Sequence, residues 1–297
     1  MITKLYRKCI PAAFRENIYN VFLGQFLLDM RNFNIRLKGL SVFLFSFLFP
    51  KNEYYDAYRY VGKYGVTLHP YKTAENYKKL SIKVLYDELE NLPYVIHNDK
   101  KLFFPKSCSD FAIKNSYRLL LIEQDENSSH RYLKSYNEIT GKILLDIGTA
   151  EGMWALDAMG YVEKMYLFEC EEKWIKPLTA TFKPYKNKVE IIRKYVSDNN
   201  SENHNTITID TFLSNKDCNN LHIKMDIEGA EQSALEGAKN TFENGRNISF
   251  SICTYHKEDD AEKISRFFSE RNYSYEFTKN YFFNYPHLRK AVIRGNN

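Results

Sequence analysis

The stretch "LLDIGTAEG" at residues 144–152 decides the fold. It places Asp146 near the end of an apolar strand pattern and follows it with two glycines, Gly148 and Gly152. Glycine allows a tight turn and a close approach to the backbone, so this pattern indicates a strand-to-helix turn that holds a nucleotide-like ligand. The dinucleotide fingerprint G-x-G-x-x-G and the phosphate-binding GxxxxGK(S/T) are both missing, which argues against a pyrophosphate ligand. The alternative is a turn that needs glycine only for its backbone geometry.

From residue 142 onward, strand patterns alternate with helix patterns. The predicted strands are 142–148, 164–170, 188–197, 221–227, 247–256, 273–277 and 290–295, and the main helices between them are 151–160, 171–182, 228–238 and 259–272. Such alternation predicts a parallel sheet with right-handed crossovers. The last two strands have no helix between them, so we expect an antiparallel hairpin at the edge. The sequence therefore predicts an α/β, doubly wound, Rossmann-like domain of seven strands over 142–297.

An accessory region, residues 61–141, precedes this domain. Residues 92–105 read as two short strands around an Asn-Asp turn, which is the signature of a hairpin. Residues 112–124 have helical spacing, and 127–133 offer an N-cap before a further helix.

Residues 1–60 form a third region, which is aromatic-rich and which we expect to be helical. It holds nine Lys/Arg against four Asp/Glu, whereas the remaining residues carry 33 of each sign. The net excess of positive charge therefore lies outside the α/β domain. A surface that binds the phosphates of a nucleic acid would need that excess on the active domain itself. We do not expect a nucleic-acid partner.

The most apolar stretch of the chain is "GLSVFLFSFLFP", residues 39–50. It is about half as long as the roughly 20 residues that span a bilayer, and it lies too far into the chain for a signal peptide. We expect a core helix or strand here. Peripheral contact with a membrane beside Arg31, Arg36 and Lys38 is the alternative.

Five cysteines, an odd number, are scattered through the sequence without a C-x-x-C pair, at positions 9, 108, 170, 218 and 253. Such a pattern predicts reduced thiols in a cytoplasmic protein. It contains no zinc-binding signature.

Acids at the ends of the first two predicted strands indicate the kind of ligand. Glu169 ends the second strand, 23 positions after Asp146, near the spacing at which an acid binds ribose hydroxyls. It could instead be an acid that favours a helix N-terminus. A ribose-binding acid beside a turn without phosphate-binding glycines suggests a nucleoside that lacks phosphates, and S-adenosylmethionine is the obvious candidate. Ser197 and Asp198, at the end of the third strand, would then flank the adenine.

The fourth strand pattern, "LHIKMDIEGAE" at 221–231, carries the chemistry. His222, Lys224, Asp226 and Glu228 alternate with apolar residues and would share one face of a strand. A central parallel strand is normally apolar on both faces, and buried charges cost several kcal/mol unless paired. A Lys224–Asp226 pair would be the minimal structural explanation. We favour a functional one, with Asp226 and Glu228 over the transferred methyl group and Lys224 orienting them, because ligands bind at this end of the sheet.

At this point the chain resembles a known family. The phrases "DIGTAEG", "LFE", "TIDTFL", "IKMDIEGAEQSALEGA" and "ICTYHKEDD" closely resemble the FkbM-type S-adenosylmethionine-dependent methyltransferases. Upstream, "LFFPK", "LLIEQD" and "SSHRYL" look like the preamble of one bacterial branch, so the resemblance spans roughly 64–285. It implies a class I methyltransferase sheet, S-adenosylmethionine as cofactor, and O-methylation of a sugar or surface glycan.

The resemblance also assigns residues by position. The cofactor would be held by Asp146, Gly148, Gly152 and Glu169, and the shared acidic motif would comprise Asp226, Glu228 and Glu231, with Asp210 in the "IDTFL" element. His256 ends the fifth strand and can face the same cleft. Asp226 and His256 are the candidate bases for removing the hydroxyl proton, and we expect Glu231 to be a positioning acid.

Three alternatives remain open. Asp210, Asp226 and Glu228 could offer Mg²⁺ several oxygens, an arrangement we do not favour, so no metal ligand is assigned. A nucleic-acid enzyme acting on a base amine would usually carry Asn/Asp-Pro-Pro-aromatic at the fourth strand end, where this chain has Met225-Asp226-Ile227-Glu228. A non-catalytic S-adenosylmethionine-binding or assembly protein could also keep the fold. The sequence leaves the acceptor and the oligomeric state open.

Overall fold

The computed structural model describes residues 24–216 and 219–297, in two compact units. The smaller unit contains the chain up to Lys78 together with Asn280–Leu288, and the larger contains Lys79–Lys279 with Arg289–Asn297. Cys9, Cys218 and the helix expected before residue 24 lie outside the described residues. The sequence-based boundaries at 60 and 141 stay predictions.

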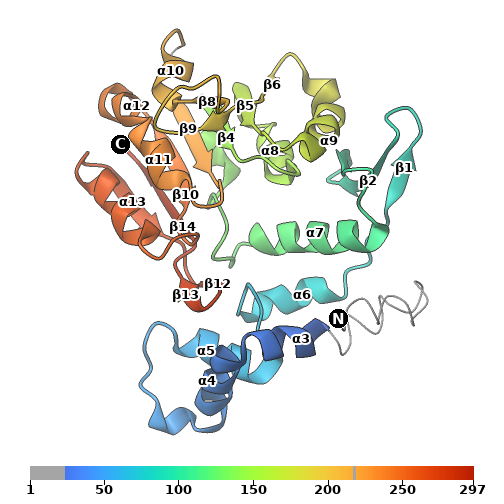
Figure 1. The fold of residues 1–297 in the computed structure, drawn as a ribbon, viewed down its shortest axis with the longest axis vertical. Helices are drawn as coiled ribbons and strands as arrows, with labels where there is room; N and C mark the ends of the chain where they lie inside the picture. Colours follow the sequence, from blue (N-terminus) through green and yellow to red (C-terminus); the bar gives the residue numbers. More distant parts are fainter. Residues whose placement is uncertain (1–23, 217–218) are drawn as a thin grey trace. The chain divides into compact units, whose positions relative to one another are not determined.

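The larger unit is built on a seven-stranded sheet (Figure 1). Its strands, in spatial order, are β11 (Ser274–Phe277), β14 (Val292–Asn296), β10 (Ser249–Cys253), β9 (Leu221–Met225), β4 (Ile143–Ile147), β5 (Lys164–Phe168) and β6 (Val189–Ile192). β10, β9, β4, β5 and β6 are parallel, whereas β14 pairs antiparallel with both β10 and β11. The predicted doubly wound sheet with an antiparallel edge pair is confirmed. Its winding reverses between β4 and β9, which is where such sheets bind ligands.

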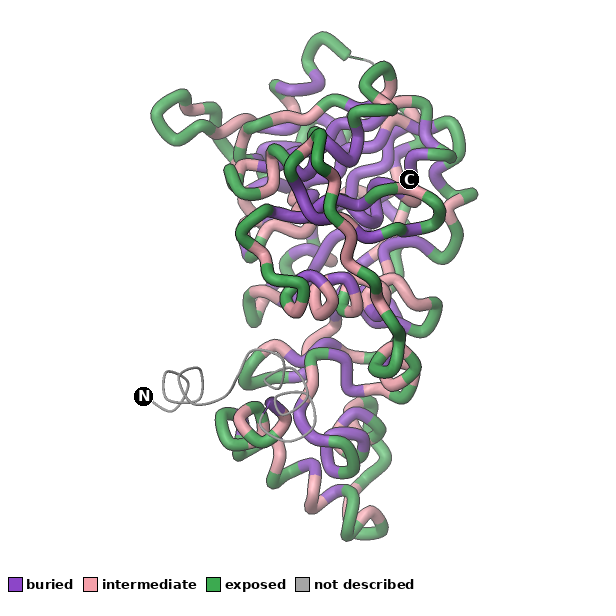
Figure 2. Tube along the Cα trace, turned by 90° about the vertical axis from the view of Figure 1, so that its right-hand side faces the viewer, coloured by how far each residue is buried: buried purple, intermediate pink, exposed green. Residues whose placement is uncertain are grey.

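Helices cover both faces of this sheet. They are α8 (Met153–Ala158), α9 (Glu172–Phe182), α10 (Ile209–Leu213), α11 (Glu231–Glu236), α12 (Lys239–Asn244) and α13 (Asp260–Ser269). Figure 1 shows α11, α12 and α13 together along one flank and α8 and α9 on the side of β5 and β6. The buried segments of Figure 2 run through the interior of this unit, and its outer loops are exposed.

Strand β9 shows why the sequence alternates. Ile223 and Met225 are fully buried in the core with Phe242 of α12 and Phe268 of α13. His222, the residue before Ile223, faces the opposite side, and the centre of its ring lies 6.2 Å from that of Trp154 in α8. The strand therefore has one apolar face and one polar face, as the alternation predicted. It ends at Met225, however, so Asp226 and Glu228 lie beyond it.

The third predicted strand, 188–197, is broken into two. After β6 the chain leaves the sheet, and β7 (Tyr195–Val196) pairs in parallel with β8 (Thr206–Ile207) as a separate small sheet. The break falls at Arg193 and Lys194, whose charged side chains pair with Glu172 and Glu202 at the surface.

Before the sheet, β1 (Leu85–Asp87), β2 (Leu92–His97) and β3 (Lys100–Phe103) form a three-stranded antiparallel sheet. Asn98 and Asp99 adopt positive φ angles of 47° and 62°, as a two-residue hairpin turn requires, so the predicted hairpin is confirmed.

Helix α7 (Asp110–Glu123) confirms the helix predicted over 112–124, with Ser109 accepting a hydrogen bond from the Ala112 amide as N-cap. The helix predicted to follow 127–133 is wrong. This segment is an irregular loop, and only a short 3₁₀ turn, η4 (Tyr136–Ile139), follows Ser135. The loop turns inward because His130 and Tyr132 are buried within the larger unit.

The smaller unit is mainly helical. It contains α3 (Gly24–Arg31), α4 (Phe33–Leu44), η2 (Ser46–Leu48), α5 (Tyr55–Tyr64), η3 (Lys72–Ala74) and α6 (Glu75–Lys78), with β12 (Phe282–Asn284) pairing with β13 (His287–Arg289). Helices α4 and α5 touch through their backbones, because a Cβ on Gly62 would lie 2.2 Å from the Gly39 carbonyl oxygen.

The core element predicted at 39–50 is present only in its first part, which belongs to α4. Gly39 and Val42 are buried against α5, but most of the large apolar side chains that follow are exposed. The exposed fractions of Phe47 and Leu48 are 81% and 67%. Among the described residues, no helix has the length and apolar character needed to cross a bilayer.

The contact between α4 and α5 gives a first prediction. Gly62→Ala should loosen this pair and destabilise it by about 1–3 kcal/mol, because the new methyl group meets backbone atoms that cannot move aside. Faster hydrogen exchange of peptides covering 33–64 should report it. Gly160→Ala is the matched control, since a Cβ there meets nothing within 4 Å. Unchanged exchange in the Gly62 variant would contradict the close packing.

Candidate active site at the carboxyl end of β9

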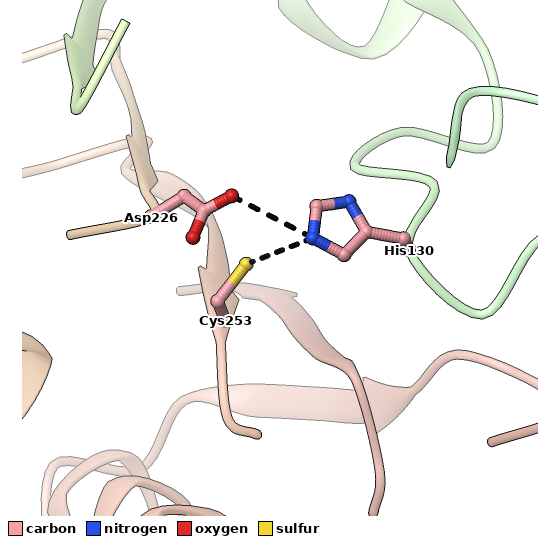
Figure 3. Close-up of side chains that lie close together, drawn as sticks. All are labelled: His130, Asp226 and Cys253. Carbon is pink, nitrogen blue, oxygen red and sulfur yellow. Dashed lines mark hydrogen bonds and ion pairs between the residues drawn. The ribbon is translucent and has the colours of Figure 1, made fainter. Parts of the chain in front are cut away.

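Polar side chains from three segments meet at the carboxyl ends of β9 and β10. Asp226 follows β9 directly, and His256 lies three residues after the end of β10. The loop 127–133 brings His130 and Tyr132 to the same place. In Figure 3, His130 and Asp226 point toward one another from separate segments, with Cys253, the last residue of β10, beside them.

Asp226 is the centre of this site. Tyr132 donates its hydroxyl proton to Oδ2 of Asp226 over 2.8 Å, and the Tyr255 hydroxyl lies 3.5 Å from Oδ1. His130 Nε2 and His256 Nε2 each approach a different carboxylate oxygen at 3.5 Å. Burial opposes the charged carboxylate, but the surrounding cationic groups and the Tyr132 hydrogen bond outweigh it and lower the pKa of Asp226. Asp226 is therefore ionised at neutral pH.

The two histidines beside Asp226 differ in protonation. Burial lowers the pKa of His130 to about 4, so this imidazole is neutral at pH 7. Burial also acts against a charge on His256, but Glu231, Asp226 and Glu228 overcome it and raise the pKa of His256. One flank of the carboxylate thus carries a neutral imidazole and the other a ring that favours its cationic form.

The acids of the motif have separate positions. Glu231 is fully buried, accepts the Ile227 amide proton over 2.9 Å and lies 2.9 Å from His256 Nδ1, so it has the contacts of a positioning acid. Glu228 has a φ of 56° and a side chain that is 92% exposed, 3.6 Å from His256 Nε2. It lies in the turn after the strand, not on the shared strand face that the alternation predicted.

Lys224 pairs with a different acid than predicted. Its Nζ lies 2.8 Å from Asp146 Oδ1 and donates to the Gly148 carbonyl over 2.6 Å, so the Lys224–Asp226 pair proposed from the sequence is wrong. The two residues face each other because Asp146 of β4 and Lys224 of β9 are direct neighbours in register. Asp146 is only 1% exposed, and its carboxylate pairs with a side chain of the protein, Lys224.

The glycine turn is shaped by packing. A Cβ on Gly148 would lie 1.9 Å from the Asp226 carbonyl oxygen, and one on Gly152 would lie 2.7 Å from the Leu178 side chain. Both positions require glycine because other protein atoms pack against them. The sequence pattern indicated the approach of a ligand there, with backbone geometry as the alternative. Glu169 accepts the Ala150 amide proton over 2.9 Å and the Glu171 amide proton over 2.7 Å, which ties the turn to the end of β5.

Ser197 and Asp198 follow β7 and contact the start of α11. Ser197 Oγ lies 3.2 Å from Ser233 Oγ, and the Asp198 amide donates to the same hydroxyl over 3.3 Å. Asp210 accepts bonds from the Asn240 and Thr241 amides at the start of α12. The helix that contains Asp210, α10 (Ile209–Leu213), is capped by Thr208, and the Asp210 carboxylate is directed to α12 instead.

Sequence reasoning missed five residues of the site. They are Glu123 at the end of α7, His130, Tyr132, Cys253 and Tyr255. Burial, with Asp226 and Glu151 nearby, raises the pKa of Glu123 to about 8, so this carboxyl group is largely protonated at pH 7. The phrase "SSHRYL" contains His130 and Tyr132, "ICTYH" contains Cys253 and Tyr255, and "LLIEQD" contains Glu123.

Residues 44–275 match the model of the family described as Methyltransferase FkbM domain. The chain belongs to the FkbM methyltransferase family. No curated protein matches it. The family recognised from the sequence motifs is thereby confirmed.

Solved structures similar to this FkbM methyltransferase are distant. A methyltransferase FkbM from Methylobacillus flagellatus KT has 18% identity and a TM-score of 0.43, covering 63% of this chain and 55% of that one. This chain therefore matches just over half the length of that protein. Precorrin-6y C5,15-methyltransferase from Geobacter metallireducens GS-15 has 10% identity and a TM-score of 0.36, covering 55% and 86%. TYW2 from M. jannaschii, solved in complex with AdoMet, has 14% identity and a TM-score of 0.36, covering 73% and 86%.

The buried pair of this FkbM methyltransferase gives a second prediction. Lys224→Met leaves Asp146 buried without its cation and should cost about 3–5 kcal/mol of unfolding free energy. The unpaired carboxyl then has a folded-state pKa raised further by burial, so the variant should lose stability as the pH rises. Urea unfolding at several pH values measures both effects. Adding Asp146→Asn should recover part of the loss, and an additive further loss would contradict the pairing.

The contact of Glu231 with His256 gives a third prediction. Glu231→Gln removes a buried negative charge and should lower the pKa of His256, measured by NMR titration of its ring protons. In the unaltered protein the stability contributed by protonated His256 is full below the unfolded-state pKa of about 6.5 and is lost as pH rises through the raised folded-state value. This pH dependence should shrink in the variant.

Glu228→Gln is the matched control for that titration. Its carboxylate also faces His256, but it is exposed to solvent and should shift the pKa much less. Equal shifts in the two variants would show that the buried acid does not control the imidazole.

Proposed function

We propose that this FkbM methyltransferase transfers a methyl group from S-adenosylmethionine to a hydroxyl group of a sugar or surface glycan. Membership of the family supports methyl transfer, and the sequence resemblance supports the donor and the acceptor class. The observation that carries the proposal is the ionised carboxylate of Asp226 at the carboxyl end of β9, surrounded by hydroxyl and imidazole groups. Such a surface suits a polar acceptor.

The donor would lie over the ends of β4 and β5. A carboxylate has about four lone-pair positions, and Glu169 uses two of them for the amides of Ala150 and Glu171. The remaining capacity suits the two ribose hydroxyls. The turn after β4, held by those same bonds and by Lys224 on Gly148, is fixed in advance for a ligand.

S-adenosylmethionine supplies a methyl group that its sulfonium already activates. The protein then has to align the acceptor hydroxyl and remove its proton, which together lower the barrier substantially. Asp226 is the base we favour, because it is ionised and 19% of its side chain is exposed. The raised pKa of His256 means that this imidazole tends to be protonated already. It is therefore better suited to orient Asp226 than to act as the base.

A fourth prediction tests the donor site. Glu169→Ala should weaken binding of S-adenosylmethionine by about 1.5–3 kcal/mol, the range for hydrogen bonds to a charged group. Isothermal calorimetry on the folded variant measures it. Glu171→Ala is the matched control, because that acid is exposed and pairs with Lys173 at the surface. If both variants bind the donor normally, the ribose assignment is wrong.

A fifth prediction tests the chemistry. Asp226→Asn keeps the shape of the side chain and removes its charge, so methyl transfer should fall by roughly 10²–10⁴-fold while donor affinity changes little. His256→Gln should cost less. A large loss in the His256 variant with a mild one in the Asp226 variant would move the base to His256. Loss of donor binding in Asp226→Asn would instead assign Asp226 to the cofactor.

An acceptor screen decides the finer part of the proposal. Purified protein is incubated with S-adenosylmethionine labelled in its methyl group and with mono- and oligosaccharides, a tetrapyrrole such as a precorrin, or RNA. Label in a sugar ether supports the proposal. Label in the other acceptors points to a different small-molecule or nucleic-acid substrate. Donor binding without label in any acceptor favours a non-catalytic binding protein.

A further inference from the structure

His130, Asp226 and Cys253 bring three metal-binding atoms together inside the larger unit. His130 Nε2 lies 3.5 Å from Asp226 Oδ2 and 3.7 Å from Cys253 Sγ, and one ligand atom from each residue lies within 4.8 Å of the other two. The three come from the 127–133 loop, the residue after β9 and the last residue of β10 (Figure 3). They converge only because the sheet and the loop meet at this point.

The separations suit ligands that share one cation. Zinc binds nitrogen and oxygen at about 2.0–2.2 Å and sulfur at about 2.3 Å in a tetrahedron, whose edges are then roughly 3.3–3.8 Å. The distance from the His130 nitrogen to the Asp226 oxygen falls in that range, and so does its distance to the sulfur of Cys253. The nitrogen–oxygen distance is longer than an ordinary N–H···O hydrogen bond of about 2.7–3.2 Å.

We propose that His130, Asp226 and Cys253 form a binding site for a divalent transition-metal cation of the zinc class. Imidazole and thiolate are ligands for such cations, whereas Mg²⁺ prefers a shell of oxygens, so this site differs from the magnesium arrangement considered from the sequence. When the cation binds, the Cys253 thiol releases its proton to solvent and the sulfur bonds to the metal as thiolate.

The surroundings favour such a site. All three residues are at least largely buried, and Asp226 is held in place by the Tyr132 hydroxyl. Hydrogen bonds of this kind fix the orientation of ligands in known metal sites. The Tyr255 hydroxyl, 3.1 Å from His130 Nε2, would have to turn away or join the ligands.

Three protein ligands leave a position for a fourth, which is the pattern of catalytic zinc sites. A hydroxyl group bound there would lose its proton more easily, as water does on zinc. This site shares Asp226 with the proposed methyl transfer, but metal affinity can be measured without donor or acceptor, so the two proposals can fail separately.

Cobalt is the probe for the test. The full-length protein is freed of metal with a chelator and titrated with Co²⁺, which should give a thiolate-to-cobalt absorption band and a tetrahedral visible spectrum at one equivalent. Zn²⁺ should displace the cobalt and bleach both. Mg²⁺ in large excess should not.

Variants separate this site from adventitious binding. Cys253→Ser and His130→Ala should each lower Co²⁺ affinity at least 10-fold, the order seen for metal-site partners, and Cys253→Ser should abolish the thiolate band. Cys108→Ser is the matched control and should leave the spectrum unchanged, since this free thiol lies at the other end of α7. No band in the unaltered protein, or a band that survives Cys253→Ser, would overturn the proposal. Circular dichroism checks that each variant is folded. Methyl transfer is measured separately in the metal-free protein, and unchanged activity there would leave the proposed function intact.

Discussion

The buried ion pair between Lys224 and Asp146 is the constraint on which the rest of the site depends. It joins the two strands between which the sheet reverses its winding, and the same ammonium also holds the Gly148 carbonyl. The carboxylate alone would be costly in this position, and so would the ammonium, because each is almost completely removed from water. Together they balance their charges across the β4–β9 ladder, whose backbone hydrogen bonds set the strand spacing. That spacing brings the Asp226 backbone against Gly148, where no side chain larger than hydrogen fits.

Much of the fold could be predicted because it is encoded locally. The alternation of strand and helix patterns after residue 142 is repeated often enough that one broken strand, at Arg193 and Lys194, does not change the topology. The two-residue turn at Asn98 and Asp99 was predictable for the same reason, since few residues tolerate its positive φ angles. Local patterns also explain the error at 127–133, where a polar N-cap signal suggested a helix but tertiary contacts draw the segment inward.

The site was predictable only in part, because its residues are assembled by topology. Asp226 and His256 stood out since each follows an apolar strand. The partner of Lys224 did not, because its choice depends on the register between β4 and β9, which the sequence of one strand does not contain. The approach of His130 to Asp226 is still less visible, since 96 positions separate them and an irregular loop connects the first to the sheet. Contacts that depend on the register between distant strands can be identified only from the three-dimensional structure.

The asymmetry around Asp226 gives the site its chemical character. On one flank, Glu231 lies 2.9 Å from His256 Nδ1 and raises the pKa of this histidine. An imidazole that already holds its proton can stabilise the Asp226 carboxylate but has little capacity to accept another. On the other flank, His130 and Cys253 are buried and uncharged at neutral pH, and they present soft donor atoms. Between these two flanks the pKa of Asp226 is lowered, so its carboxylate keeps its negative charge. The two sides of Asp226 thus differ in charge, because Glu231 raises the pKa of His256 on one side and burial lowers that of His130 on the other.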